Sequence, residues 1–121
     1  MNFNNILIGS EDPKRLTDYY RRLFGEPTMD DGTYSGWMIG SGFVAVGPHS
    51  EVHGQNREPG RIIWNIESPD VPGDFERLKG AGAIVVREPY EYEGMVGWIA
   101  TLADPDGNYF QLMSPFEEAT A

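Results

Sequence analysis

Near its carboxyl end, the chain places a neutral amide in the middle of an expected strand. The stretch DPDGN is rich in turn-forming residues, and the alternating residues after it predict a strand over 109–113. Tyr109, Gln111 and Met113 would share one face of that strand, while the residues between them are apolar and indicate core. Because a glutamine amide both donates and accepts hydrogen bonds, Gln111 is a candidate ligand-binding group.

Both histidines of the chain lie in the segment HSEVH, as His49 and His53 on either side of Glu51. On a helix, this spacing could bind a metal ion. The segment follows Pro48 and precedes Gly54, so we favour a solvated loop and keep metal binding as an alternative.

The acidic stretch REPYEYEG (87–94) is interpreted as a hairpin loop. Its glutamates Glu88, Glu91 and Glu93 could attract a cation, although a solvated loop is the preferred interpretation.

The elements that would position these residues repeat along the chain. A strand over 3–9 is followed by a helix that Asp12 caps and Gly25 ends, and then by a hairpin of two strands. The polar, proline-containing segment 48–60 reads as a linker. A second strand over 61–67, a helix opened by Asp70 and three more strands follow in the same order. Residues at equivalent positions in the two halves, such as Asp12 and Asp70, are separated by nearly equal numbers of residues along the chain, which predicts a duplicated unit.

Composition limits the function classes. The 121 residues fit one domain, with module one at about 1–47, the linker at 48–60 and module two at about 61–115. A net charge of −10 argues against nucleic acid and anionic membranes as partners and would suit a cationic small molecule, although it can equally serve solubility alone. There is no cysteine, and no long apolar run or basic leader, so we expect a cytoplasmic protein.

Three segments together resemble the vicinal oxygen chelate superfamily, which includes glyoxalases, bleomycin-resistance proteins and extradiol dioxygenases. They are DPKRLTDYYRRLFG, DFERLKGAGA and DPDGNYFQL, in that order along the chain. The resemblance implies an α+β fold in which two tandem βαβββ modules form a cupped, open mixed sheet. It also implies a ligand cavity inside the cup and, commonly, a homodimer.

Metal-using members of this superfamily hold a divalent ion with His, Glu or Gln side chains from the first and last strand of each module. The matching positions here are Asn5, Ile63, Gln111 and an aliphatic residue among 44–46. Amides and hydrocarbons are poor ligands for a divalent ion. We therefore expect neither the metal site nor any other cofactor.

Strand alternation from these positions places several polar residues on the inner face of the cup, where they would bind a ligand or simply bond one another or water. The tryptophans at 37 and 98 belong to strands expected to wall the cup, with sheet packing or dimer contact as the alternative. The predicted ligand-binding residues are Asn5, Trp37, Asn65, Glu67, Trp98, Tyr109, Gln111 and Met113.

The favoured function is a metal-free, small-molecule-binding homodimer that sequesters a cationic or aromatic compound, as bleomycin-resistance proteins do. The alternative is a metal-independent isomerase or lyase with Glu67 as the candidate catalytic base. A divalent-metal-dependent glyoxalase or dioxygenase agrees less well with the ligand positions, and nothing in the sequence favours a protein-interaction module.

Overall fold

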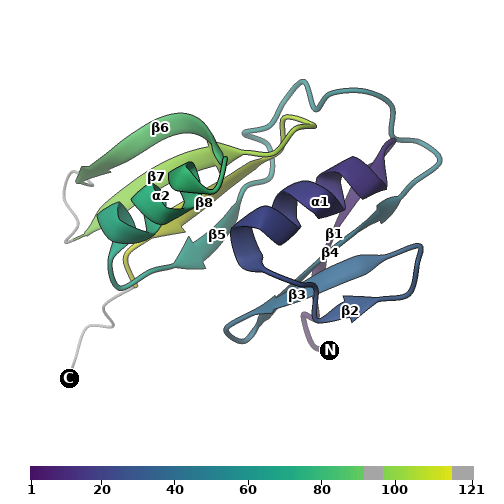
Figure 1. Ribbon diagram of the computed structural model, residues 1–121, viewed down its shortest axis with the longest axis horizontal. Helices are drawn as coiled ribbons and strands as arrows, with labels where there is room; N and C mark the ends of the chain where they lie inside the picture. The colour runs from purple at the N-terminus through teal and green to yellow at the C-terminus, as the bar shows by residue number, and fades with distance from the viewer. Residues whose placement is uncertain (92–96, 116–121) are drawn as a thin grey trace. The chain divides into compact units, whose positions relative to one another are not determined.

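The computed structural model describes residues 1–91 and 97–115, and the chain forms two compact units (Figure 1). The first unit holds residues 1–57 together with 104–107, and the second holds 58–103 and the residues from 108 onward. The first contains β1 (Ile6–Ser10), α1 (Pro13–Phe24), β2 (Met29–Asp30), β3 (Ser35–Ile39) and β4 (Gly42–Pro48). The second contains β5 (Trp64–Glu67), α2 (Val71–Gly80), β6 (Ile84–Glu91), β7 (Trp98–Ala103) and β8 (Tyr109–Met113).

Both units have the same topology. Sheet A has the strand order β1-β4-β3-β2, and sheet B has the order β5-β8-β7-β6. In each sheet the first and last strands of the module pair in parallel, and the other pairs are antiparallel. The predicted α+β class and the repeated βαβββ module are therefore confirmed. Within the described residues, no helix is long and apolar enough to cross a membrane.

The strand-to-helix junctions repeat in atomic detail. Ser10 ends β1 and Ser68 directly follows β5, and each Oγ accepts a hydrogen bond from the backbone N–H of the helix-capping aspartate, at 3.0 and 3.1 Å. The carboxylates of Asp12 and Asp70 in turn accept from backbone N–H groups in the first helical turn, at 3.2 and 3.1 Å. These caps satisfy donors that a helix start leaves without intrahelical partners.

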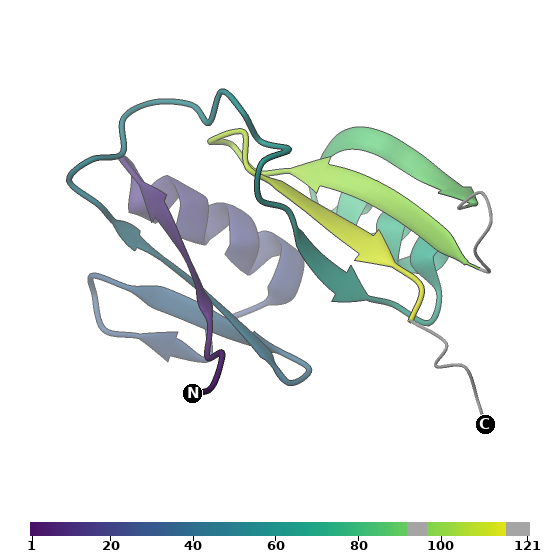
Figure 2. The same cartoon turned by 180° about the vertical axis from the view of Figure 1, so that it is seen from behind.

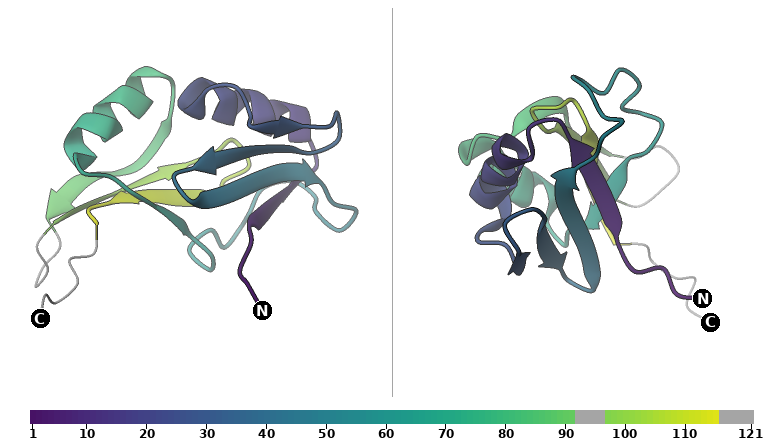
Figure 3. Two further views of the ribbon diagram at one scale, coloured as in Figure 1. Left: turned by 90° about the horizontal axis from the view of Figure 1, so that it is seen from below. Right: turned by 90° about the vertical axis from the view of Figure 1, so that its right-hand side faces the viewer.

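Each sheet buries one face against its own helix, as the views from behind and from the side show for each unit (Figures 2 and 3). In the first unit, α1 contributes Leu16, Tyr19, Tyr20 and Leu23 to the core, and β4 contributes Val44 and Val46. In the second unit, the core is formed by Val71, Phe75 and Leu78 of α2 with Leu102, Phe110 and Leu112 of the sheet. The alternation predicted for 109–113 thus identified the buried residues of that strand correctly.

Three boundaries differ from the prediction. β1 starts at Ile6 rather than Phe3, and β5 starts at Trp64 rather than Arg61. The segment interpreted as a loop at 87–94 is in fact strand as far as Glu91, while its remainder, with Glu93, lies outside the described residues. Pro89 and two glutamates, Glu88 and Glu91, concealed this strand because such residues are rare inside regular sheets.

Candidate functional site

Sheet B presents its polar residues on the face opposite α2. In β5 and β8, Asn65 lies beside Gln111 and Glu67 lies beside Met113, alternating with the buried residues that face the helix. We call this surface the helix-free face of sheet B. It is formed by Asn65, Glu67, Arg87, Tyr90, Ile99, Thr101, Tyr109, Gln111 and Met113. The structure therefore gathers five predicted site residues, namely Asn65, Glu67, Tyr109, Gln111 and Met113, on one face.

A row of polar side chains crosses all four strands of this face. Asn65 is in register with Gln111, Gln111 with Thr101, and Thr101 with Arg87. At about 4.8 Å per strand spacing, the row is roughly 14 Å long, which suits a small molecule. Gln111 is oriented within it, because its Nε2 donates a hydrogen bond to Thr101 Oγ1 at 3.0 Å. That bond leaves the Gln111 carbonyl oxygen available to accept.

The polar row lies between apolar neighbours. On one side, Met113 is in register with Ile99, which in turn is opposite Tyr90. On the other side, Tyr109 is in register with Ala103. A few polar groups set into an apolar and aromatic surface are the usual composition of a small-molecule site.

Sequence reasoning missed four residues of this face. Ile99 and Thr101 lie in the strand from which Trp98 was predicted instead, and Arg87 and Tyr90 lie in a segment that was taken for a loop. The pairing of β6 with β7 shifts register between Val85 and Arg87 and again between Arg87 and Tyr90. In a regular strand, residues three apart point to opposite faces, whereas the second shift turns both Arg87 and Tyr90 to the same face. The Arg87 guanidinium carbon accordingly lies 3.6 Å from the centre of the Tyr90 ring. Pro89, between them, was the available signal, because proline in a sheet is confined to edges and irregularities.

Glu67 lies at the end of β5, an edge strand of sheet B, and its side chain is exposed. It is one row away from Gln111, on the same face. Catalytic groups are usually enclosed in a pocket, and the exposed Glu67 side chain is not. The geometry therefore favours a contact role for Glu67 over the catalytic one.

Sheet A offers a different surface. Asn5 is exposed just before β1, and its side-chain amide donates to Asn4 Oδ1 at 2.7 Å. On the face opposite α1, Ala45 lies beside Leu7, so Ala45 is the first-module counterpart of Gln111 that the sequence could not single out within 44–46. Aromatic rings cover two glycines on this sheet. A Cβ added to Gly36 would lie 2.2 Å from Phe43, and one added to Gly47 would lie 2.1 Å from Tyr34.

Neither tryptophan lies on the helix-free face of its sheet, and Trp37 follows the alternative interpretation, sheet packing. Trp37 is only 2% exposed and packs beneath α1, with its ring 6.0 Å from that of Tyr20 and its Nε1 donating to Gly25 O at 2.9 Å. Trp98 is 38% exposed, but it alternates with Ile99 and so belongs to the face of sheet B that α2 packs on. The sequence identified the two strands correctly but not which face each tryptophan occupies.

The donor set at the family's metal positions does not fit a divalent ion. Its first-module members are Asn5 and the methyl side chain of Ala45, and its second-module members are Ile63 and Gln111. None of these side chains is a carboxylate or an imidazole, the strong oxygen and nitrogen ligands of such ions. Among the described residues, no group of three or more His, Cys, Asp or Glu side chains is placed to hold a metal ion.

His49 and His53 lie on an exposed loop rather than on a helix, which agrees with the preferred interpretation. The Nδ1 atom of His49 accepts a hydrogen bond from the backbone N–H of Glu51 at 3.1 Å. This nitrogen therefore has a structural role within the turn.

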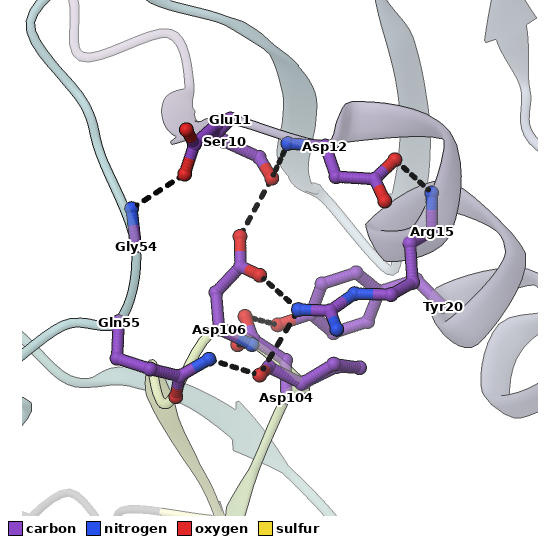
Figure 4. Close-up of polar contacts among 10 residues, drawn as sticks. Ser10, Glu11, Asp12, Arg15, Tyr20, Gly54, Gln55, Asp104 and Asp106 are labelled. Carbon is purple, nitrogen blue, oxygen red and sulfur yellow. Dashed lines mark hydrogen bonds and ion pairs between the residues drawn. The ribbon is translucent and has the colours of Figure 1, made fainter.

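The DPDGN turn has an architectural role. Residues 104–107 belong to the first unit, where Asp106 is 7% exposed and its carboxylate accepts from Ser10 Oγ at 2.6 Å and from Arg15 at 2.9 Å (Figure 4). The buried Asp104 accepts from the Tyr20 hydroxyl at 2.7 Å. Both carboxylates are satisfied by partners within the unit, as buried charges must be.

The comparison with known families agrees with this architecture. The model of the glyoxalase-like domain family matches residues 5–113. The chain belongs to this family. The match confirms the resemblance to the glyoxalase and bleomycin-resistance superfamily. No curated protein matches this glyoxalase-like domain in sequence.

Solved structures repeat its fold. A conserved domain protein is 20% identical with a TM-score of 0.77, and the match covers 96% of this chain and 100% of that one. A glyoxalase/bleomycin resistance protein/dioxygenase family enzyme from Burkholderia phytofirmans PsJN is 19% identical with a TM-score of 0.74, covering 96% and 100%. A glyoxalase-related enzyme from Fulvimarina pelagi is 18% identical with a TM-score of 0.71, covering 100% and 96%. At these identities, the likeness establishes the fold alone.

Proposed function

We propose that this glyoxalase-like domain binds a small aromatic molecule on the helix-free face of sheet B and does so without a divalent metal. The observation that carries the proposal is the polar row across that face, from Asn65 through Gln111 and Thr101. Hydrogen-bonding groups in an apolar and aromatic surface fix the orientation of a ligand, while the surrounding apolar side chains supply affinity.

Metal independence rests on the chemistry of the side chains. Where relatives place imidazoles and carboxylates, this chain has Asn5, Ala45, Ile63 and Gln111. A chain that retained metal chemistry would need stronger ligands at some of these positions. Gln111 instead serves as a hydrogen-bonding group that Thr101 orients.

Metal content provides the first test. Purified protein incubated with nickel, zinc, manganese and ferrous iron should retain less than about a tenth of an equivalent of metal, a cutoff appropriate to a specific site. About one equivalent per chain would overturn the proposal. The variant lacking both His49 and His53 would then show whether the loop supplies the ligands.

Ligand binding is tested with a neutral aromatic probe, 2-naphthamide, followed by NMR of the backbone and side-chain amides. We expect shifts of the Gln111 side-chain amide and of residues of β8, with saturation. Gln111→Leu should weaken binding about fivefold to tenfold, the effect of losing one oriented hydrogen bond. Shifts confined to sheet A, or an unchanged affinity in Gln111→Leu, would refute the site. Sedimentation of the same samples tests the expected homodimer.

A further inference from the structure

The helix-free face of sheet B, as defined above, carries the Arg87 guanidinium as well as the Glu67 carboxylate. Four other arginines pair with carboxylates, namely Arg15, Arg21, Arg61 and Arg77. Arg87 lies over the Tyr90 ring, and no carboxylate of the described residues is within ion-pair distance of it. Arg87 is exposed, so its N–H donors are available to an acceptor from outside the described part of the chain.

Two irregularities in β6 determine this placement. The register shifts on either side of Arg87 bring it opposite Thr101 and place Tyr90 on the same face. β-bulges commonly re-aim side chains beside functional sites. The contact with Tyr90 holds the guanidinium at the end of the polar row, because an aromatic face attracts a cation and restricts its motion.

The geometry points to a ligand that is an aromatic carboxylate, and this inference rests on the proposed function. Its ring would lie on Met113 and Tyr90, its carboxylate would accept from Arg87, and a further polar group would reach Gln111. Arginine offers a planar fork of donors that matches a carboxylate, which makes the pairing selective as well as attractive.

This conclusion reverses the expectation drawn from net charge. The chain carries a net charge of −10, which on its own favours a cationic ligand. At physiological ionic strength, however, exposed charges more than about 8 Å apart are largely screened. A group that touches the ligand therefore outweighs the distant surface acids in deciding which charge is bound.

Three probes that share one ring system test the inference: 2-naphthoate, 2-naphthamide and 2-naphthylmethylammonium, titrated by calorimetry. We expect the wild-type protein to bind the naphthoate at least about tenfold more tightly than the naphthamide, as a charge-assisted hydrogen bond implies. Arg87→Gln should bring that ratio close to one. Arg87→Lys should retain part of the preference, because lysine keeps the charge without the fork.

Arg22→Gln is the matched control, because it removes the same charge from an exposed arginine that lies 5.6 Å from the Tyr19 ring on α1. It should keep the preference for naphthoate. Equal binding of naphthoate and naphthamide, or a preference that survives in Arg87→Gln, would overturn the role of Arg87 while leaving the proposed function intact. Tighter binding of the ammonium probe than of the naphthoate would also overturn the role of Arg87, and would point to Glu67 as the charged group that contacts the ligand. If none of the probes binds, the proposed function fails as well.

Discussion

Replacing Asp106 by alanine should destabilise the protein more than its position in a turn suggests. The carboxylate is buried and accepts from Ser10 Oγ at 2.6 Å and from Arg15 at 2.9 Å. Losing the buried hydrogen bond to a charged acceptor costs about 1.5–3 kcal/mol. The Arg15 side chain is 53% exposed, so its ion pair adds at most about 1 kcal/mol. We therefore expect the free energy of unfolding to fall by about 2–4 kcal/mol.

Asp74→Ala is the matched control for this experiment. Asp74 also accepts from a serine hydroxyl at 2.6 Å, but its partner Ser68 is close in sequence. The Asp74 side chain is 37% exposed. The loss of Asp74 should cost about 1 kcal/mol, because its carboxylate is already partly hydrated in the folded protein, whereas that of Asp106 is buried. Urea unfolding of both variants measures the difference, and hydrogen exchange at Asn56, whose N–H donates to the backbone oxygen of Asp106, reports the local effect. Equal losses in the two variants would refute the argument.

Three further predictions concern packing and charge. Trp37→Ala should lower the free energy of unfolding by about 3–5 kcal/mol and Trp98→Ala by less than about 1.5 kcal/mol, because of the two only Trp37 is buried. Chemical unfolding measures both losses. Similar losses in the two variants would contradict the placement of Trp37 in the core. Gly47→Ala should destabilise the folded protein by about 1–3 kcal/mol, because the added Cβ would lie 2.1 Å from the Tyr34 ring. Gly60→Ala is the control in thermal unfolding, because a Cβ at that position meets nothing within 4 Å. The backbone N–H groups of Tyr34 and Thr33 lower the pKa of the Asp31 carboxyl below its ordinary value, so its stabilising effect is present at neutral pH and is lost as the pH falls through the lowered pKa. A carbon NMR titration of Asp31 with an ordinary midpoint would contradict this.

The predictable part of the candidate site came from strand alternation. Once 109–113 was assigned as a strand, Gln111 had to share a face with Tyr109 and Met113, and the register with β5 brought in Asn65. Alternation is a local property of extended backbone and needs no knowledge of distant contacts. The tryptophan assignments failed because the face that a strand buries depends on the helix packed against it.

The acidic stretch after residue 86 shows the limit of local patterns. Its composition suggested a solvated loop, yet pairing with β7 makes it strand as far as Glu91. Hydrogen bonds to a neighbouring strand override weak intrinsic preferences, and the register shifts that aim Arg87 and Tyr90 arise only when two strands are paired.

By itself, the sequence determined the two repeated modules, the capped helices, the buried faces of those helices, and the lack of strong ligands at the family's metal positions. These features depend on local periodicity, on capping chemistry and on residue type, all of which can be read along the chain. Only the tertiary structure decided that Trp37 is core, that Asp106 is buried among Ser10 and Arg15, and that Arg87 ends a polar row. Each of these depends on contacts between residues far apart in sequence, whose geometry is set by packing and strand register.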